Sequence, residues 1–215
     1  MIRVLLADDH AIVRAGLKEI LAGTGDITVA AEATNGQEVL ERVRAADFDV
    51  AVLDMSMPGR SGIELIKLVK DEKPKLRILV LTMHSEEQYA VRALRAGASG
   101  YLTKDSATEQ LVAAIRRIAA GGAYVSAETA ELLARDAVPR TDAAPHTLLS
   151  DREFQVFRMI AGGKTVGSIA RQLSLSVKTV STHKTRILAK MGLANQAELI
   201  RYALEHKLLD DPPGS

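Results

Sequence analysis

Two kinds of apolar pattern alternate between residues 2 and 121. Short continuous apolar runs are typical of parallel strands that are buried on both faces. Apolar residues that recur every three or four positions are typical of helices with one buried face. The runs that predict strands cover residues 2–7, 28–33, 50–53, 77–81 and 100–102, and a helical pattern follows each of them. This strict alternation favours an α/β doubly wound five-stranded parallel sheet.

The pattern changes after Gly121-Gly122. Residues 123–147 contain the spacing for one short helix, then two prolines and many alanines without apolar periodicity, so we expect a linker. Helical patterns return after residue 148, and two short ones meet at the turn Ser174-Leu175-Ser176, which predicts a helix-turn-helix. The predicted division is a first domain at 1–122, a linker at 123–147, a small all-α four-helix domain at 148–209 and a tail at 210–215.

The composition excludes several classes of protein. A chain of 215 residues is long enough for one or two domains. It contains no cysteine, which excludes disulfides, thiol catalysis and cysteine-based zinc sites and suits a cytoplasmic protein. No apolar run approaches the ~20 residues of a membrane span, and the first residues are too short and too acidic for a signal peptide. We therefore expect a cytoplasmic protein without a membrane partner.

The formal net charge of +1 hides a strong asymmetry between the two predicted domains. Residues 148–209 contain ten Lys/Arg and four Asp/Glu, a balance of +6, which leaves −5 for the rest of the chain. An acidic first domain and a basic last domain indicate two separate tasks, of which the second involves a polyanion.

Polar side chains stand where the predicted strands end. Asp8 and Asp9 follow the first strand, Asp54 the third, Thr82 the fourth and Lys104 the fifth. Because parallel strands end at one edge of the sheet, where α/β folds bind ligands, these groups should meet. Three crowded carboxylates need a cation such as Mg²⁺, and a hydroxyl and an ammonium suit a phosphoryl group on Asp54. Taken singly, each residue has an ordinary alternative: a turn or helix cap, a strand-end hydroxyl, or a solvated lysine.

These five markers, spread over residues 2–121, resemble the receiver domain of bacterial response regulators, which has a flavodoxin-like fold. The resemblance implies that Asp54 is the phosphoacceptor. It also implies that Asp9 and Asp54 bind Mg²⁺ directly and that Asp8 binds it partly through water. The backbone carbonyl of Ser56 would be a further metal ligand.

The same resemblance assigns roles to other residues of the predicted edge. Thr82 and Lys104 would each bind a phosphoryl oxygen, and Tyr101 would turn inward as a switch when Thr82 is drawn to the phosphate. A cis peptide bond after Lys104 is also implied. His10 and His84 are expected to flank the site without taking part in its chemistry. Taken alone, Tyr101 could equally be a half-buried core aromatic.

The predicted helix at residues 177–191 has two unlike faces. Apolar residues fall on one side, whereas the other side is small and hydroxylic with basic residues around it. The helix contains no acidic residue, although solvated surface helices commonly carry Glu–Lys pairs. Such a face can enter the major groove of DNA. The outer positions are Lys178, Thr182, Thr185 and Ala189, with Ser181 and Arg186 at the flanks.

The motifs Leu149-Ser-Asp-Arg-Glu153, Ile169-Ala170, Ser176-Val-Lys-Thr-Val180 and Lys190-Met-Gly-Leu193 together resemble the LuxR-type DNA-binding domain. One departure is Gly167, which lies inside the predicted second helix. Since glycine in a helix costs about 1 kcal/mol, that helix could start late. Phosphate contacts give affinity and register, and base contacts give specificity. The resemblance implies base contacts from Ser181, Thr182 and Thr185, and phosphate contacts or a framing role from Lys164, Thr165, Lys178, Thr179, His183, Lys184, Arg186 and Lys190.

Both domains together identify the chain as similar to the NarL/FixJ group of response regulators. This implies a DNA-binding transcriptional regulator whose Asp54 is phosphorylated, with Mg²⁺, by a sensor histidine kinase. We expect a homodimer to form on phosphorylation and to bind double-stranded DNA. We expect no enzyme activity beyond the chain's own phosphoryl transfer and slow dephosphorylation. Two alternatives stay open: a dimeric DNA-binding regulator that is independent of phosphorylation, and an aspartyl-phosphate hydrolase. The hydrolases usually need an aspartate where this chain has Ser56. For His183, packing between helices is an alternative to a phosphate contact.

Overall fold

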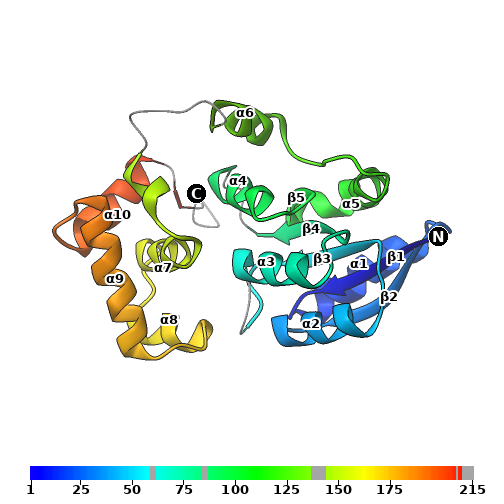
Figure 1. The fold of residues 1–215 in the computed structure, drawn as a ribbon, viewed down its shortest axis with the longest axis horizontal. Coiled ribbons are helices and arrows are strands. Elements are labelled where there is room, and N and C mark those ends of the chain that lie inside the picture. Colours follow the sequence, from blue (N-terminus) through cyan, green and yellow to red (C-terminus); the bar gives the residue numbers. More distant parts are fainter. Residues whose placement is uncertain (59–61, 84–86, 137–143, 207, 210–215) are drawn as a thin grey trace. The chain divides into compact units, whose positions relative to one another are not determined.

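The computed structural model describes residues 1–58, 62–83, 87–136, 144–206 and 208–209 (Figure 1). The chain divides into two compact units, Met1–Leu133 and Ala134–Ser215, and each is described by itself. The division falls inside the predicted linker at 123–147. The predicted tail at 210–215 lies outside the described residues.

The first unit contains a five-stranded parallel sheet in the order β2-β1-β3-β4-β5. Strand β3 lies at the centre, and all of its residues are buried, as its continuous apolar run predicts. The predicted doubly wound five-stranded fold is confirmed. The strands are β1 (Ile2–Ala7), β2 (Ile27–Ala33), β3 (Val50–Asp54), β4 (Arg77–Thr82) and β5 (Gly100–Thr103).

Helices cover both faces of this sheet, as Figure 1 shows. Helices α1 and α5 contact each other and share one core with the sheet, to which Leu21, Leu111 and Val52 belong. On the other side, α2 contacts α3 and α3 contacts α4. The two helical layers leave the carboxyl ends of the strands together at one edge. The helices are α1 (Ala11–Ala22), α2 (Gly36–Ala45), α3 (Gly62–Glu72), α4 (Glu87–Arg95) and α5 (Lys104–Ala119).

The chain returns to the sheet after α5. Tyr124 forms a parallel bridge with Gly100: its N–H donates to the Ser99 carbonyl over 3.1 Å, and its carbonyl accepts from the Tyr101 N–H over 2.9 Å. Gly100 permits this approach, because a Cβ there would lie 2.9 Å from the Tyr124 carbonyl oxygen. The first residues of the predicted linker are thus hydrogen-bonded to β5, and α6 (Ala127–Asp136) follows them.

The second unit is helical and contains the predicted helix-turn-helix. Its core includes Phe154 and Phe157, which are fully buried and stack with their ring centroids 5.8 Å apart. Ser174, in the tight turn between the two helices of the motif, has a φ of 53°. The elements are the 3-10 helix η1 (Pro145–Leu148), α7 (Asp151–Ala161), α8 (Val166–Gln172), α9 (Val177–Met191) and α10 (Gln196–Glu205).

Local sequence signals set the helix ends in this unit. Ser150 and Glu153 form the predicted capping box at the start of α7. The Thr165 hydroxyl caps α8 by accepting from the Ser168 N–H, three residues further on. Helix α8 therefore begins directly after its cap, and Gly167 does not delay its start. Gly192, with a φ of 67°, ends α9 in the left-handed conformation that glycine tolerates.

The helices are short compared with a membrane span. Among the described residues the longest is α5, with 16 residues, whereas a span needs about 20 predominantly apolar ones. Within the described part of the chain, no helix has both the length and the apolar character to cross a membrane.

Candidate functional sites

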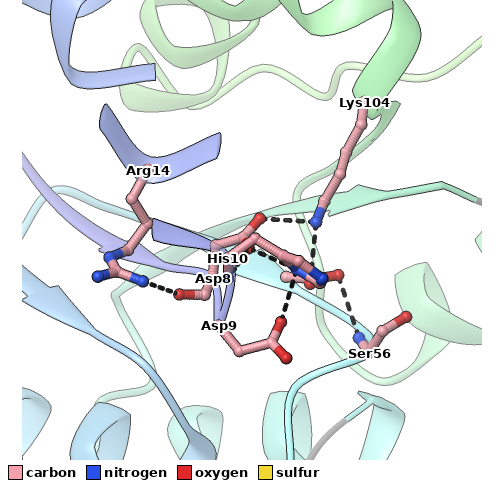
Figure 2. Close-up of polar contacts among 7 residues, drawn as sticks. Asp8, Asp9, His10, Arg14, Ser56 and Lys104 are labelled. Atoms are coloured by element: carbon pink, nitrogen blue, oxygen red, sulfur yellow. Dashed lines mark hydrogen bonds and ion pairs between the residues drawn. The ribbon is translucent and has the colours of Figure 1, made fainter. Parts of the chain in front are cut away.

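The carboxyl ends of β1, β3 and β5 bring three charged side chains into contact (Figure 2). Asp8 follows β1 and Asp54 ends β3, and the pairing of Ala7 with Leu53 places these strand ends side by side. Both aspartates are 1% exposed. Lys104 directly follows β5, and its Nζ lies 2.7 Å from Asp8 Oδ2 and 3.0 Å from Asp54 Oδ2. One ammonium therefore bridges two buried carboxylates.

Asp9 and His10 extend this acidic cluster. The His10 N–H donates to Asp8 Oδ1 over 2.8 Å, and the ring Nδ1 lies 3.0 Å from Asp9 Oδ1 and 3.3 Å from Asp8 Oδ1. The Arg14 guanidinium donates to the Asp8 carbonyl over 2.8 Å and ties the turn to α1. One donor atom from each of Asp8, Asp9, His10 and Asp54 lies within 4.8 Å of the others. These atoms are close enough together to share one ion.

The pKa values of Asp54 and Lys104 are both raised, but for opposite reasons. Burial raises the pKa of the Asp54 carboxyl, although the Lys104 ammonium and the Ser56 N–H, which donates to Asp54 Oδ1 over 3.1 Å, act against this. Burial alone would lower the pKa of Lys104, but the contacts with Asp8 and Asp54 outweigh it and raise that pKa. Lys104 therefore stays charged, and the site keeps a fixed cation beside Asp54.

The residues of this cluster fit a hard divalent cation. The carboxylates of Asp8, Asp9 and Asp54 lie close together, and among the described ion pairs the Lys104 ammonium contacts Asp8 and Asp54 only. Among the described residues, the buried Asp8 Oδ2 has no well-aligned hydrogen bond, although Lys104 Nζ lies close to it. A buried carboxylate oxygen in this position is costly without further compensation. Oxygen donors with open positions are what Mg²⁺ binds, so these three aspartates could hold it.

Thr82 lies on β4, the strand next to that of Asp54, and Tyr101 lies on β5, one strand further along the sheet. Thr82 ends β4 and is fully buried, one residue beyond Leu81, which pairs with Asp54. Tyr101 lies on β5 and is only 8% exposed. The side chain of Tyr101, which the resemblance expects to turn inward as a switch, is therefore already buried in this structure.

The outer face of α9 is polar, as its pattern predicts. One apolar residue that the helical pattern assigns to the buried face is exposed instead. Val180, Ile187 and Met191 are buried, whereas Val177, which the helical angle puts on the same side, is 57% exposed. Val177 begins the helix, where the neighbouring elements do not reach over it. The predicted DNA contacts that are exposed on α9 are Lys178, Ser181, Thr182, Thr185, Arg186 and Lys190.

Several of the predicted DNA contacts also bond within the second unit. Lys190 Nζ lies 2.6 Å from Glu153 Oε2, and Glu153 is buried. Two further basic side chains donate to glutamine oxygens, and several of the hydroxyls form bonds at helix N-termini or within α9. These bonds include Lys164 to Gln172, Lys184 to Gln196, Thr165 with the Ser168 N–H, and Thr179 with Ser176.

His183 belongs to α9, is half-buried, and lies near Arg152 and Glu153 of α7. Among the described residues its ring Nδ1 is buried without a hydrogen-bond partner. Burial, together with the charge of Arg152, lowers the pKa of His183. These surroundings favour a neutral ring that packs between helices, which is the alternative that the sequence leaves open.

The sequence assigns no such polar contact to His10, whose ring faces the aspartates, to Arg14, which holds the Asp8 carbonyl, or to Glu153, which binds Lys190. The signals for two of them were the position of His10 directly after Asp8-Asp9 and the pairing of Glu153 with Ser150 in the capping box. The peptide bond after Lys104 is trans, as are all those of the described residues, so the cis bond is not present. His84 lies outside the described residues.

Two family models match this chain, one in each unit. The model described as response regulator receiver domain matches residues 4–116. The model described as bacterial regulatory proteins, luxR family, matches residues 147–203. Together the two matches span most of the chain.

Full-length relatives share this arrangement. The chain is 37% identical over 209 residues to the response regulator UvrY of Escherichia coli K12, covering 97% of this chain and 96% of UvrY. It is 39% identical over 215 residues to the oxygen regulatory protein NreC of Staphylococcus aureus RF122, covering 97% and 99%. It is 37% identical over 211 residues to the response regulator GacA of Pseudomonas viridiflava, covering 98% and 99%.

Solved structures of the RcsB response regulator of Salmonella typhimurium have a similar fold. One has a TM-score of 0.73 at 29% identity and covers 95% of this chain and 97% of RcsB. Another, RcsB bound to the promoter P1flhDC with the phosphomimetic BeF3⁻, has a TM-score of 0.66 at 30% identity and covers 94% and 97%.

Proposed function

Since this chain belongs to the response regulators that join a receiver domain to a LuxR-type DNA-binding domain, we propose that phosphorylation of Asp54 controls its binding to DNA. The family consists of DNA-binding transcriptional regulators of two-component systems rather than conventional enzymes. A receiver domain implies a sensor kinase as partner, and a LuxR-type domain implies DNA. The observation that carries the proposal is the buried contact of Lys104 with both Asp8 and Asp54.

Asp54 is the nucleophile of the proposed reaction with the phosphohistidine of a sensor histidine kinase. A carboxylate oxygen of Asp54 attacks phosphorus, and an O–P bond forms as the P–N bond breaks. The electron pair of that bond passes to the histidine ring, which takes up a proton, and Asp54 becomes an acyl phosphate. The carboxylate must be ionised to attack. Lys104 supports this, because its charge opposes the effect of burial on the pKa of Asp54.

Asp8, Asp9 and Asp54, with the backbone carbonyl of Ser56, are the proposed ligands of Mg²⁺. When bound, Mg²⁺ supplies the positive charge that offsets repulsion between the carboxylates and an incoming phosphoryl group. The chain's own contribution is to hold these ligands in place. Arg14 fixes the turn that carries Asp8, and the Ser56 N–H orients Asp54 through its Oδ1.

Lys104 and Thr82 are the proposed binding groups for the new phosphoryl oxygens. Lys104 already lies 3.0 Å from Asp54 Oδ2, so its ammonium can pair with an oxygen that is added there. Thr82 ends the neighbouring strand and can donate its hydroxyl. Movement of Thr82 toward the phosphoryl group would change the packing of Tyr101. The surface around β5 would then favour a second conformation, which is a population shift rather than a new fold. The same groups would allow slow dephosphorylation by water.

The second unit is proposed to bind double-stranded DNA through the exposed side of α9. Its base-facing residues are Ser181, Thr182 and Thr185, and the basic residues around them, with Lys178 foremost, contact phosphates. RcsB structures are described as dimers bound to DNA, and we propose that this chain also binds as a homodimer with one α9 in each of two successive major grooves. Because its proposed ligand is chromosomal DNA, the proposed location of the protein is the cytoplasm.

Intact-protein mass spectrometry tests the phosphoacceptor. The full chain is incubated with acetyl phosphate and Mg²⁺, and the wild type should gain the mass of one phosphoryl group. Asp54→Asn should gain none, because its amide cannot form the acyl phosphate. Asp105, an exposed aspartate of α5, serves as the matched control, and Asp105→Asn should be labelled like the wild type. Labelling of Asp54→Asn would overturn the assignment.

A further inference from the structure

The ring of His10 is directed at the aspartates of the proposed metal site rather than away from it (Figure 2). His10 stands at the N-cap position of α1, but in the described structure its side chain makes no capping hydrogen bond. Its backbone is held on both sides, since its N–H donates to Asp8 Oδ1 and its carbonyl accepts from the Arg14 N–H over 3.0 Å. The polar contacts of the ring itself are with Asp8 and Asp9.

The spacing of these atoms suits coordination of one ion. Donors on adjacent corners of an octahedron around a cation at about 2.1 Å lie about 3.0 Å apart. His10 Nδ1 lies 3.0 Å from Asp9 Oδ1 and 3.3 Å from Asp8 Oδ1. Lys104 approaches Asp8 and Asp54 through their Oδ2 atoms instead. The histidine and the lysine therefore use different oxygens of Asp8, and the ring does not compete with the ammonium.

From this geometry we propose that His10 is a fifth protein ligand of the metal site, beside the three carboxylates and the Ser56 carbonyl, and that it gives the site a preference for a first-row transition ion such as Mn²⁺ over Mg²⁺. The inference rests on the proposed function, because it assumes that the aspartate cluster binds a divalent ion. Mg²⁺ takes oxygen ligands almost exclusively, whereas an imidazole nitrogen suits transition metals. A site with three carboxylates alone would distinguish the two ions less.

The competing arrangement is a hydrogen bond in which His10 Nδ1–H donates to Asp9 Oδ1. It needs the proton on Nδ1, whereas a ligand nitrogen must be unprotonated and leaves the proton on Nε2. The side chain of His10 is 64% exposed, so solvent can satisfy Nε2 in the coordinated form. The two arrangements differ in whether a nitrogen is bonded to the metal, which spectroscopy can measure.

Pulsed electron paramagnetic resonance of Mn²⁺ bound to the full chain, at mildly alkaline pH, tests the proposal. The wild type should show coupling from a directly bonded nitrogen, and His10→Ala should not. His206→Ala, which removes an exposed histidine of the second unit, should keep the coupling. By calorimetric titration, His10→Ala should lower the ratio of Mn²⁺ affinity to Mg²⁺ affinity about tenfold.

Absence of nitrogen coupling in the wild type, or an unchanged affinity ratio in His10→Ala, would overturn the role of His10. The proposed function would survive either result, because it needs only that Mg²⁺ and a phosphoryl donor label Asp54 in the wild type. Failure of that labelling would overturn the proposed function instead.

Discussion

Lys190 of α9 lies with its Nζ 2.6 Å from Oε2 of Glu153, a buried residue at the start of α7. Glu153 also accepts from the Ser150 N–H through the same oxygen. A lysine that the LuxR-type resemblance assigns to the DNA face therefore also joins two helices of the domain. Its charge serves stability as well as any contact with phosphate.

Removal of this lysine should destabilise the DNA-binding unit. Lys190→Ala leaves the Glu153 carboxylate without its cation. Because Lys190 is partly exposed, we expect the free energy of unfolding to fall by about 1–2 kcal/mol, which lies between the values for exposed and buried ion pairs. Denaturant unfolding, followed for the transition of the second unit, measures this. Lys178→Ala, which removes an exposed lysine from the same helix, should cost no more than about 0.5 kcal/mol. Equal stability of the two variants would contradict the role of Glu153.

The same carboxylate predicts a pH dependence. Burial acts to raise the pKa of Glu153, but the bonds from Lys190 and Ser150 outweigh it and hold the pKa below the ordinary value of a glutamate. A carboxyl with a depressed folded-state pKa contributes stability that is present above its unfolded pKa and is lost as the pH falls through the folded pKa. The unfolding free energy of the second unit should therefore decline on acidification below about pH 4.5. Glu153→Gln should flatten this decline, and an identical pH profile would rule out the contribution.

Mg²⁺ should stabilise the receiver unit. A ligand that binds only the folded state adds RT ln(1 + [L]/Kd), or about 2.7 kcal/mol at a concentration of 100 times Kd. The melting temperature of the first transition should rise with Mg²⁺ and return to its starting value with a chelator. Asp9→Asn should lose most of this rise, because it removes a proposed ligand that is partly exposed and makes no contact with Lys104 among the described ion pairs. A full rise in Asp9→Asn would remove Asp9 from the site.

Two glycines of the receiver unit should respond to alanine in opposite directions. Gly16 lies within α1, and among the described residues nothing lies within 4 Å of a Cβ placed there. Gly16→Ala should therefore stabilise by up to about 1 kcal/mol. Gly100→Ala should destabilise, because its Cβ would meet the Tyr124 carbonyl at 2.9 Å and break the bridge to β5. Thermal unfolding measures the change in stability of both variants. Amide hydrogen exchange at Tyr101, whose N–H donates to the Tyr124 carbonyl, reports whether the bridge to β5 is intact. Protection of the Tyr101 amide in Gly100→Ala would contradict the predicted loss of this bridge.

Substitutions on α9 should separate affinity for DNA from sequence preference. Thr182→Ala or Thr185→Ala should alter the preferred base at one position of a selected duplex, at a cost of about 1–3 kcal/mol for the original base. Lys178→Ala should weaken binding to all duplexes alike and reduce the salt dependence by about one counterion. Selection from random duplexes, followed by salt titration, distinguishes them. A change of base preference in Lys178→Ala would place that lysine in the groove rather than on the backbone.

The arrangement of the receiver pocket can be predicted from the sequence because the inference needs only the order of the strands and the residues that follow them. Continuous apolar runs that alternate with helical patterns predict a parallel sheet, and parallel strands end at a common edge. Asp8, Asp54 and Lys104, which each stand at the end of such a run, then meet without any knowledge of side-chain conformations. The caps Ser150 and Thr165 are equally local, since a cap and its acceptor lie within one helical turn.

What the sequence did not predict depends on side-chain direction or on pairs far apart in the chain. The ring of His10 could turn either to solvent or to the aspartates, and no periodicity distinguishes the two. Lys190 and Glu153 come from different helices, and their contact depends on how α7 and α9 pack. The bridge of Tyr124 to Gly100 needs the end of α5 to return beside β5, which the loose pattern after Gly122 does not reveal.

The dependence of DNA affinity on Asp54 tests the proposed control most directly. A duplex selected by the full chain from random sequences is titrated with the wild type and with Asp54→Asn, each with and without acetyl phosphate and Mg²⁺. A coupling of about 1–3 kcal/mol corresponds to a rise of roughly 5- to 150-fold in affinity, and this rise should occur only in the wild type with the phosphoryl donor. An unchanged affinity in the phosphorylated wild type, or an equal response in Asp54→Asn, would show that DNA binding is not controlled through this carboxylate.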